Sequence, residues 1–294
     1  MNPQNTNDDL VYPLIEEEGR RLLQALRENP YAPRYTHESQ DRLTAKGLEL
    51  VQAFEKQLKT MPIGWQSGDH PAWLEEFVNT CFQDVPFYRG YGSPPKDFDS
   101  IPTCHRDDLA REPWSFVPDP LSLDDMVLYQ TSGTTGHPLN ILTHPEPLAM
   151  YIPLLRAALG HHSIDLEGKK GRVAIVLVCF QKNTWTYASI SPVLNQAGFV
   201  KVNLNPDDWN SSTDRALFLD DCDPEIYTGD PLSFAELMRL PLKTHPKALI
   251  STAMTLSPAL REKLENHFGC SVIDLYSMNE TGPIAVAKEQ GYIL

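Results

Sequence analysis

Apolar residues recur along this chain in two patterns. In the first 60 residues, leucines stand at helical spacing between charged residues, which predicts amphipathic helices over residues 8–29 and 38–60. From residue 124 onward, short apolar runs alternate with longer mixed stretches. Runs such as residues 173–180 are continuous, which is typical of strands buried on both faces of a sheet.

The two patterns predict a series of elements with recognisable ends. Strands are expected at residues 126–130, 172–179, 199–204, 225–228, 247–251 and 271–276. Helices are expected around residues 71–81 and at 145–159, 184–197, 211–220, 231–239 and 258–268. Residues 86–120 are rich in proline and aspartate and are expected to form an irregular connector. Asp230-Pro231 and Ser257-Pro258 mark two helix starts, and Gly269 marks a helix end.

Apolar strands joined by helices indicate an α/β fold, with a mostly parallel sheet covered by helices on both faces. We expect residues 1–120 to form an N-terminal helical region and connector, and residues 121–294 to form an α/β nucleotide-binding region. Ligands of such sheets bind beyond the carboxyl ends of the strands. Segments that directly follow strands are therefore the first candidates for a site.

Charge and cysteine content narrow the class of protein. The 294 residues carry a formal net charge of −14, which argues against a nucleic-acid partner because such partners need a basic face. The five cysteines form no C-x-x-C pair, so neither a disulfide framework nor a zinc site is expected, and a cytoplasmic location fits best. The N-terminus lacks the order of a signal peptide, and no apolar run is long enough to span a membrane.

The densest run of small and hydroxyl residues is Thr131, Ser132, Gly133, Thr134, Thr135 and Gly136. It follows the apolar run 126–129. Glycine lets the backbone approach an anion closely and the hydroxyls add donors, so the run predicts a phosphate-binding loop. An ordinary surface loop is the simpler alternative. The P-loop of ATPases is excluded, because that motif needs lysine after its second glycine and this chain has His137.

A second segment, residues 274–283, sets an aromatic residue, Tyr276, four positions before Glu280. Together the two segments resemble the phosphate-binding loop and the adenine- and magnesium-binding segment of the acyl-adenylate-forming (AMP-binding) superfamily. Gly282-Pro283 and the Pro86-Phe87-Tyr88-Arg89 stretch resemble its phenylacetate–CoA ligase branch. The resemblance extends from about Phe77 to the end of the chain.

This resemblance implies an acyl-CoA ligase that uses ATP, Mg²⁺ and coenzyme A to activate a small carboxylic acid as an acyl-adenylate. It implies that Glu280 is the catalytic metal ligand and that the loop, with His137, holds phosphates. It places further nucleotide contacts at Ser251, Thr252, Ala253, Tyr276, Ser277 and Asn279, and substrate contacts at Trp185 and Tyr187.

Each of these residues also has a simpler structural reading. Tyr276 fits a core strand position, and Glu280 fits a solvated turn. Trp185 fits a helix-packing role. Ser251 and Thr252 fit the end of a strand.

The sequence also departs from the family pattern. The family usually has lysine at the position of His137, Ser or Thr at Asn279, and glycine at Ser277, and Ser251-Thr252-Ala253 lacks its usual glycines. The resemblance further implies a part beyond Leu294 that carries the catalytic lysine, so we expect a C-terminally truncated form or an N-terminal portion.

Two classes of function therefore remain open: the carboxylate-activating enzyme, and a noncatalytic nucleotide-binding or interaction protein of the same fold. A homodimer, or a separate chain that supplies the C-terminal domain, is the expected protein partner.

Overall fold

The computed structural model describes residues 10–61, 70–130, 139–288 and 291–293. The chain forms two units, which we describe separately. The α/β unit comprises Met1–Ile63 and Leu148–Leu294, and the inserted unit comprises Gly64–Pro147. The predicted boundary at residue 120 falls inside the inserted unit, and the N-terminal helix Glu17–Glu28 packs on the sheet of the α/β unit.

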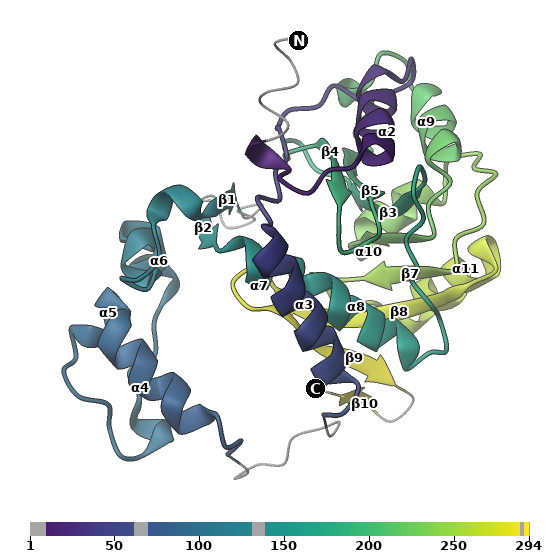
Figure 1. Cartoon of the computed structure of the whole chain (residues 1–294). Coiled ribbons are helices and arrows are strands. Elements are labelled where there is room, and N and C mark those ends of the chain that lie inside the picture. The colour runs from purple at the N-terminus through teal and green to yellow at the C-terminus, as the bar shows by residue number, and fades with distance from the viewer. Residues whose placement is uncertain (1–9, 62–69, 131–138, 289–290, 294) are drawn as a thin grey trace. The chain divides into compact units, whose positions relative to one another are not determined.

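Among the described residues, eight strands of the α/β unit form one sheet (Figure 1). In spatial order they are β10 (Gly291–Ile293), β9 (Gly282–Lys288), β8 (Ser271–Met278), β7 (Ala248–Ser251), β6 (Ile226–Gly229), β3 (Val173–Cys179), β5 (Ala197–Asn203) and β4 (Tyr187–Ser191). The five central strands, from β8 to β5, are parallel to one another, and the strands at both margins are antiparallel. The five strands predicted from residue 172 onward are the five parallel strands.

Helices cover both faces of this sheet and bury two hydrophobic clusters, as predicted. On one face, α2 (Glu17–Glu28), α9 (Asp214–Cys222), α10 (Pro231–Leu237) and α11 (Pro258–Phe268) contribute to the larger cluster. On the other face, α8 (Tyr151–Gly160) contributes to the second cluster and packs against α3 (Ala45–Leu58). The fold class is therefore α/β with a mostly parallel sheet.

The predicted helix ends are confirmed. The side chain of Asp230 accepts a hydrogen bond from the backbone N–H of Ser233, and Ser257 accepts one from Leu260. Gly269 ends α11 in the left-handed conformation, at φ 66°.

One predicted helix is wrong. Residues 184–197 form β4 and a turn, because Tyr187–Ser191 pairs in antiparallel fashion with β5. The N-terminal segment is tied to the residues just before this strand, since Thr36 donates to Thr186 Oγ1 and to the Thr184 carbonyl, and its hydroxyl accepts from the Thr186 N–H. The helix forecast for 145–159 is divided into α7 (Pro145–Ala149) and α8.

The first predicted helix is interrupted: Leu10 and Val11 are helical, and α2 begins only at Glu17. Before it, the side-chain amide of Gln196 donates to the Leu14 carbonyl and accepts from the Glu16 N–H. The chain there is fixed by the turn after β4 rather than by helical hydrogen bonds. Similarly, α3 begins at Ala45, capped by the Thr44 hydroxyl.

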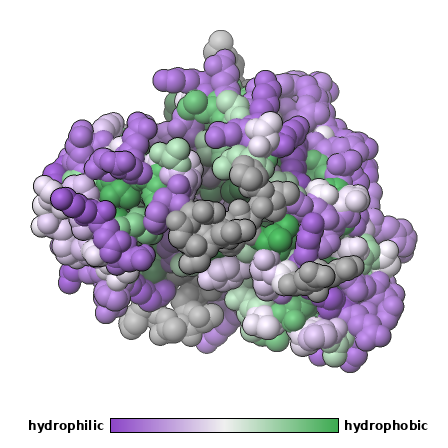
Figure 2. Space-filling model, turned by 90° about the horizontal axis from the view of Figure 1, so that it is seen from below, coloured by the Kyte–Doolittle hydropathy of each residue, from purple (hydrophilic) through white to green (hydrophobic). Residues whose placement is uncertain are grey.

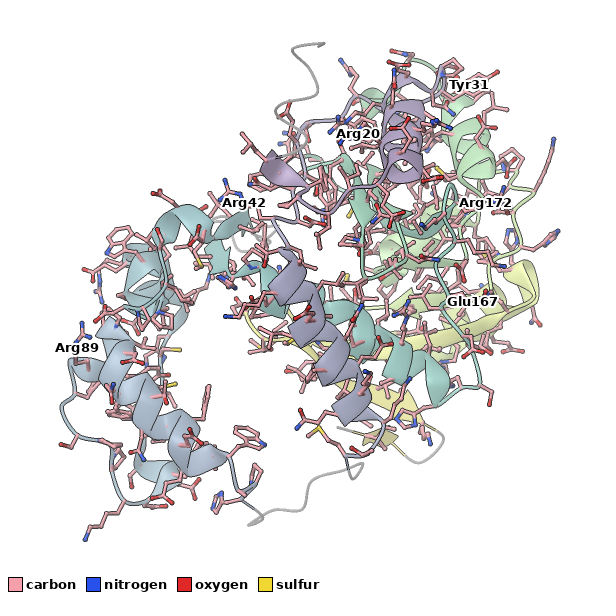
Figure 3. The ribbon with its side chains drawn as sticks, in the orientation of Figure 1. Arg20, Tyr31, Arg42, Arg89, Glu167 and Arg172 are labelled. Carbon is pink, nitrogen blue, oxygen red and sulfur yellow. The ribbon has the colours of Figure 1, made fainter. Side chains whose placement is uncertain are left out.

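The inserted unit consists of short helices and a small sheet. Its elements are α4 (Leu74–Asp84), α5 (Pro86–Arg89), η1 (Phe98–Ser100), α6 (Arg106–Arg111), η2 (Pro113–Phe116), η3 (Leu123–Asp125), β1 (Val127–Gln130) and β2 (Asn140–Thr143). The described strands of its sheet, β1 and β2, are antiparallel. Arg89, labelled in Figure 3, pairs with Asp119, and Phe87 stacks on Phe116 at 4.4 Å. The predicted irregular stretch 86–120 thus contains four short helices.

The face in Figure 2 is mainly hydrophilic, with separate hydrophobic patches. No helix in the described part of the chain is long and apolar enough to cross a membrane.

Candidate functional site

The carboxyl ends of three adjacent parallel strands bring several predicted site residues into one region. In register, Gly229 of β6 lies opposite Ser251 of β7, and Ser251 lies opposite Asp274 of β8. Tyr276 follows two residues later on β8. These strand ends are where ligands bind in open α/β sheets.

The ends of β6 and β7 are held in place by close packing of their backbones. A Cβ atom at Gly229 would lie 2.8 Å from the carbonyl oxygen of Val178 on β3, so only glycine fits there. The Gly229 carbonyl accepts a hydrogen bond from Thr252 N–H at 2.9 Å. Asp230 then caps α10, with its two carboxylate oxygens 2.9 Å from the backbone nitrogen and the hydroxyl of Ser233.

The segment Ser251-Thr252-Ala253 contains a buried hydroxyl group without a partner in the described part of the chain and a residue with an unfavourable backbone conformation. Ser251 is fully buried, and its Oγ has no hydrogen-bond partner among the described residues. Ala253 has φ 66°, a left-handed conformation that alanine disfavours. Unpaired buried groups and strained backbone concentrate at functional sites, so both observations mark this turn as a candidate ligand contact.

Tyr276 does not occupy a buried core position of its strand, the simpler alternative, since its side chain is 54% exposed. The pairing of β8 with β9 shifts register between Tyr276 and Ser277. Such a bulge bends a strand and re-aims its side chains. The aromatic ring is therefore open for stacking at the end of β8.

Asn279 and Glu280 lie in the turn that joins β8 to β9, and both are exposed. Exposure is equally compatible with a metal ligand and with a solvated turn carboxylate. Within the described ranges, no group of three or more His, Cys, Asp or Glu residues is arranged to hold a metal ion. A Mg²⁺ ion bound with nucleotide phosphates needs only one or two carboxylates, so Glu280 fits that mode of binding.

Asp274 belongs to the same region but was not predicted as a site residue. It stands two residues before Tyr276 on β8 and therefore on the same face of the strand. Its Oδ2 accepts a hydrogen bond of 2.6 Å from the hydroxyl of Tyr292 on β10. The signal in the sequence that could have identified Asp274 is the alternation of side chains along a strand, which places Asp274 and Tyr276 on the same face.

Trp185 and Tyr187 lie at the opposite margin of the sheet. The Trp185 ring stacks on His37 at 4.2 Å, and Tyr187 on β4 stacks on Phe199 at 6.2 Å. Burial, and then the charge of Lys201, lower the pKa of His37, which favours its neutral form. Four strands separate β4 from β8, so the structure does not bring Tyr187 beside Tyr276. Their role in substrate binding stays a prediction.

The predicted phosphate loop, Thr131 to Gly136, and His137 lie outside the described residues. In the sequence they stand between β1 and β2. Their role also stays a prediction.

Two further histidines, His161 and His162, follow the end of α8. The ring nitrogen Nε2 of His162 lies 3.1 Å from the Ala287 carbonyl oxygen, just beyond the end of α8. Burial, followed by the charges of Lys288 and His162, lowers the pKa of His161.

Comparison with solved structures identifies the fold. A 2-hydroxyisobutyryl-CoA ligase in an open conformation, in complex with 2-HIB-AMP and CoA, aligns with 74% of this chain and 55% of its own, at 16% identity and a TM-score of 0.51. The same ligase in the postadenylation state, with 2-HIB-AMP, aligns with 83% of this chain and 52% of its own, at 15% identity and a TM-score of 0.51. This chain has the fold of the large N-terminal domain of adenylate-forming enzymes.

The likeness is one of fold. This chain spans about half the length of those ligases. No protein-family model and no curated protein matches the sequence.

Proposed function

We propose that this chain belongs to the acyl-adenylate-forming superfamily, binds ATP at the ends of β6, β7 and β8, and activates a small carboxylic acid as an acyl-adenylate. The observation that carries the proposal is the exposed ring of Tyr276 at the end of β8, with Glu280 in the following turn. The shared fold and the motif resemblance support it. Transfer to coenzyme A, in the manner of the phenylacetate–CoA ligase branch, is the finer part of the proposal.

The chemistry of the strand ends suits a nucleotide. Tyr276 offers a face on which adenine stacks, an interaction worth about 1–3 kcal/mol for base–aromatic pairs. The Asp274 carboxylate is an acceptor for the amino group of the base, because amino groups donate hydrogen bonds. The unpaired Ser251 hydroxyl is a second polar group within the same strand ends. Leaving such a group unsatisfied costs about 1–3 kcal/mol.

Glu280 is the residue that we assign to Mg²⁺. A carboxylate oxygen is a preferred ligand of this ion, which usually retains water and phosphate oxygens as its other ligands. When bound, the ion neutralises charge on the triphosphate during attack at phosphorus. Asn279, beside Glu280, presents an amide that donates to phosphate oxygens where the family usually has a hydroxyl.

The direct test is carboxylate-dependent exchange of pyrophosphate into ATP, measured over a panel of small aliphatic and aromatic acids. Exchange that requires one of the acids would support the enzyme. Binding of ATP without exchange for any acid would favour the noncatalytic nucleotide-binding protein. Absence of both would contradict the proposal.

A matched pair of variants tests the metal ligand. Glu280→Gln should abolish the Mg²⁺ dependence of ATP binding, because an amide is a weaker ligand than a carboxylate. Glu262→Gln makes the same change at an exposed position of α11 and should leave that dependence intact. Equal behaviour of the two variants would remove Glu280 from the metal site.

A further inference from the structure

The hydroxyl of Tyr292 reaches across β9 to the carboxylate of Asp274. Tyr292 pairs with Ala287 on β9, the strand that separates β10 from β8. Because the alanine side chain is small, the two polar groups meet above it, with Tyr292 Oη 2.6 Å from Asp274 Oδ2. Hydrogen bonds of this length to a charged acceptor are among the strong ones in proteins.

This bond leaves one carboxylate oxygen of Asp274 available. Among the described residues, Oδ1 has no hydrogen-bond partner, whereas Oδ2 is occupied by Tyr292. Asp274 and Tyr276 point to the same side of β8, and alternate residues of a strand are about 6–7 Å apart. A purine stacked on the exposed ring of Tyr276 therefore extends toward the Asp274 carboxylate.

We propose that Tyr292 is a positioning residue that makes this site select adenine over guanine. By holding Oδ2, it turns Oδ1 of Asp274 toward the edge of the stacked base. Adenine presents an amino donor at the position where guanine presents a carbonyl acceptor. The carboxylate accepts from the first and repels the second. This inference rests on the proposed nucleotide function.

The ionisation of Tyr292 is consistent with a permanent donor. The hydrogen bond to Asp274 is the largest cause that raises the pKa of Tyr292, followed by burial and by the charge of Asp274, while Arg261 lowers it. The hydroxyl therefore stays protonated at neutral pH. Arg261 on α11 is itself engaged, since it donates to the Val272 carbonyl at 2.7 Å.

The test is the ratio of ATP to GTP affinity, measured by calorimetry on the full chain. The wild type should prefer ATP by about tenfold or more, the factor that a hydrogen bond to a base edge supplies. Tyr292→Phe removes one oxygen from a side chain that is 55% exposed, so we expect the fold to be retained. It should lower the ratio several-fold, and Asp274→Asn should lower it at least as far.

Two controls separate positioning from a structural effect. Tyr91→Phe makes the same change at a tyrosine that is 53% exposed in the inserted unit, and it should leave the ratio unchanged. In the double variant Tyr292→Phe, Asp274→Asn, the ratio should equal that of Asp274→Asn alone, because Tyr292 acts through Asp274. Equal weakening of ATP and GTP by Tyr292→Phe would mean a structural role only and would overturn the inference.

A measurement on the wild type covers the case in which Tyr292→Phe fails to fold. Purine riboside triphosphate lacks the amino group of ATP, so it should bind about tenfold more weakly than ATP. Equal binding would overturn the inference while leaving the proposed function in place. If none of these nucleotides binds the wild type, the proposed function fails and the inference fails with it.

Discussion

The backbone of Gly168 lies against the carbonyl group of Leu194, in the loop that precedes β3. A Cβ atom at Gly168 would stand 2.8 Å from the Leu194 carbonyl carbon. The Gly168 N–H also donates to Glu225 Oε1 at 2.8 Å, and its φ is 70°. This buried contact joins three segments that are far apart in the sequence.

Gly168→Ala should therefore destabilise the protein strongly. The left-handed conformation costs alanine about 1–2 kcal/mol, and overpacking against Leu194 adds about 1–3 kcal/mol. Gly171 is the control, since its φ is 72° but a Cβ atom there would meet nothing within 4 Å. Urea denaturation should show a loss for Gly171→Ala of about 1–2 kcal/mol only. Equal losses of unfolding free energy in the two variants would mean that packing of Gly168 against Leu194 does not contribute to stability.

Ala253→Gly should stabilise the protein. Glycine removes the left-handed strain of about 1–2 kcal/mol, and its greater freedom in the unfolded chain costs part of that gain. A net increase of about 0.5–1 kcal/mol in the free energy of unfolding is expected. Ala157→Gly makes the same change at an exposed position inside α8 and should destabilise by about 1 kcal/mol. Thermal melts of the two variants should thus shift in opposite directions.

Asp41 should make stability depend on pH. Burial raises the pKa of its carboxyl from 3.8 to about 7, although the hydrogen bond from Leu43 N–H opposes this. The folded state thus binds the proton more tightly than the unfolded state. The stabilisation from Asp41 is complete below about pH 4 and is lost as the pH rises through about 7.

Asp41→Asn removes this titration, because an amide stays neutral. At pH 8 the variant should be more stable than the wild type by more than about 1 kcal/mol, the value of one pKa unit. Asp107→Asn, at an exposed position, should leave the pH profile of stability unchanged. Parallel pH profiles for wild type and Asp41→Asn would show that Asp41 stays ionised in the fold.

Tyr276→Ala should weaken ATP binding by about 1–3 kcal/mol, the contribution of base–aromatic stacking. Tyr276→Phe keeps the ring and should bind ATP as the wild type does. Because the side chain is 54% exposed, both variants should melt near the wild-type temperature. Unchanged affinity in Tyr276→Ala, measured by calorimetry, would place the base elsewhere.

Strand pairing explains where prediction from the sequence failed. Residues 184–197 contain apolar residues at spacings that suit a helix, yet Tyr187–Ser191 extends along β5. The residues just before this strand are then hydrogen-bonded by Thr36, about 150 positions earlier in the chain. Hydrogen bonds between such distant segments leave no local signal.

In the candidate site, too, residues of a local motif can be predicted from the sequence, whereas residues brought in by contacts between distant segments cannot. Tyr276 and Glu280 are predicted from the sequence because both belong to one short motif. Tyr292 is not, since its partner Asp274 is 18 residues away and meets it only through β9.

The sequence by itself determined the five parallel strands, the caps at Asp230, Ser257 and Gly269, and the α/β class. Continuous apolar runs and capping residues act through local backbone preferences and burial, which need no distant partner. The tertiary structure alone decided that β4 is a strand, that α2 begins at Glu17, and that Tyr292 meets Asp274. Each of these depends on contacts between remote segments, whose free energy exists only after the chain has folded.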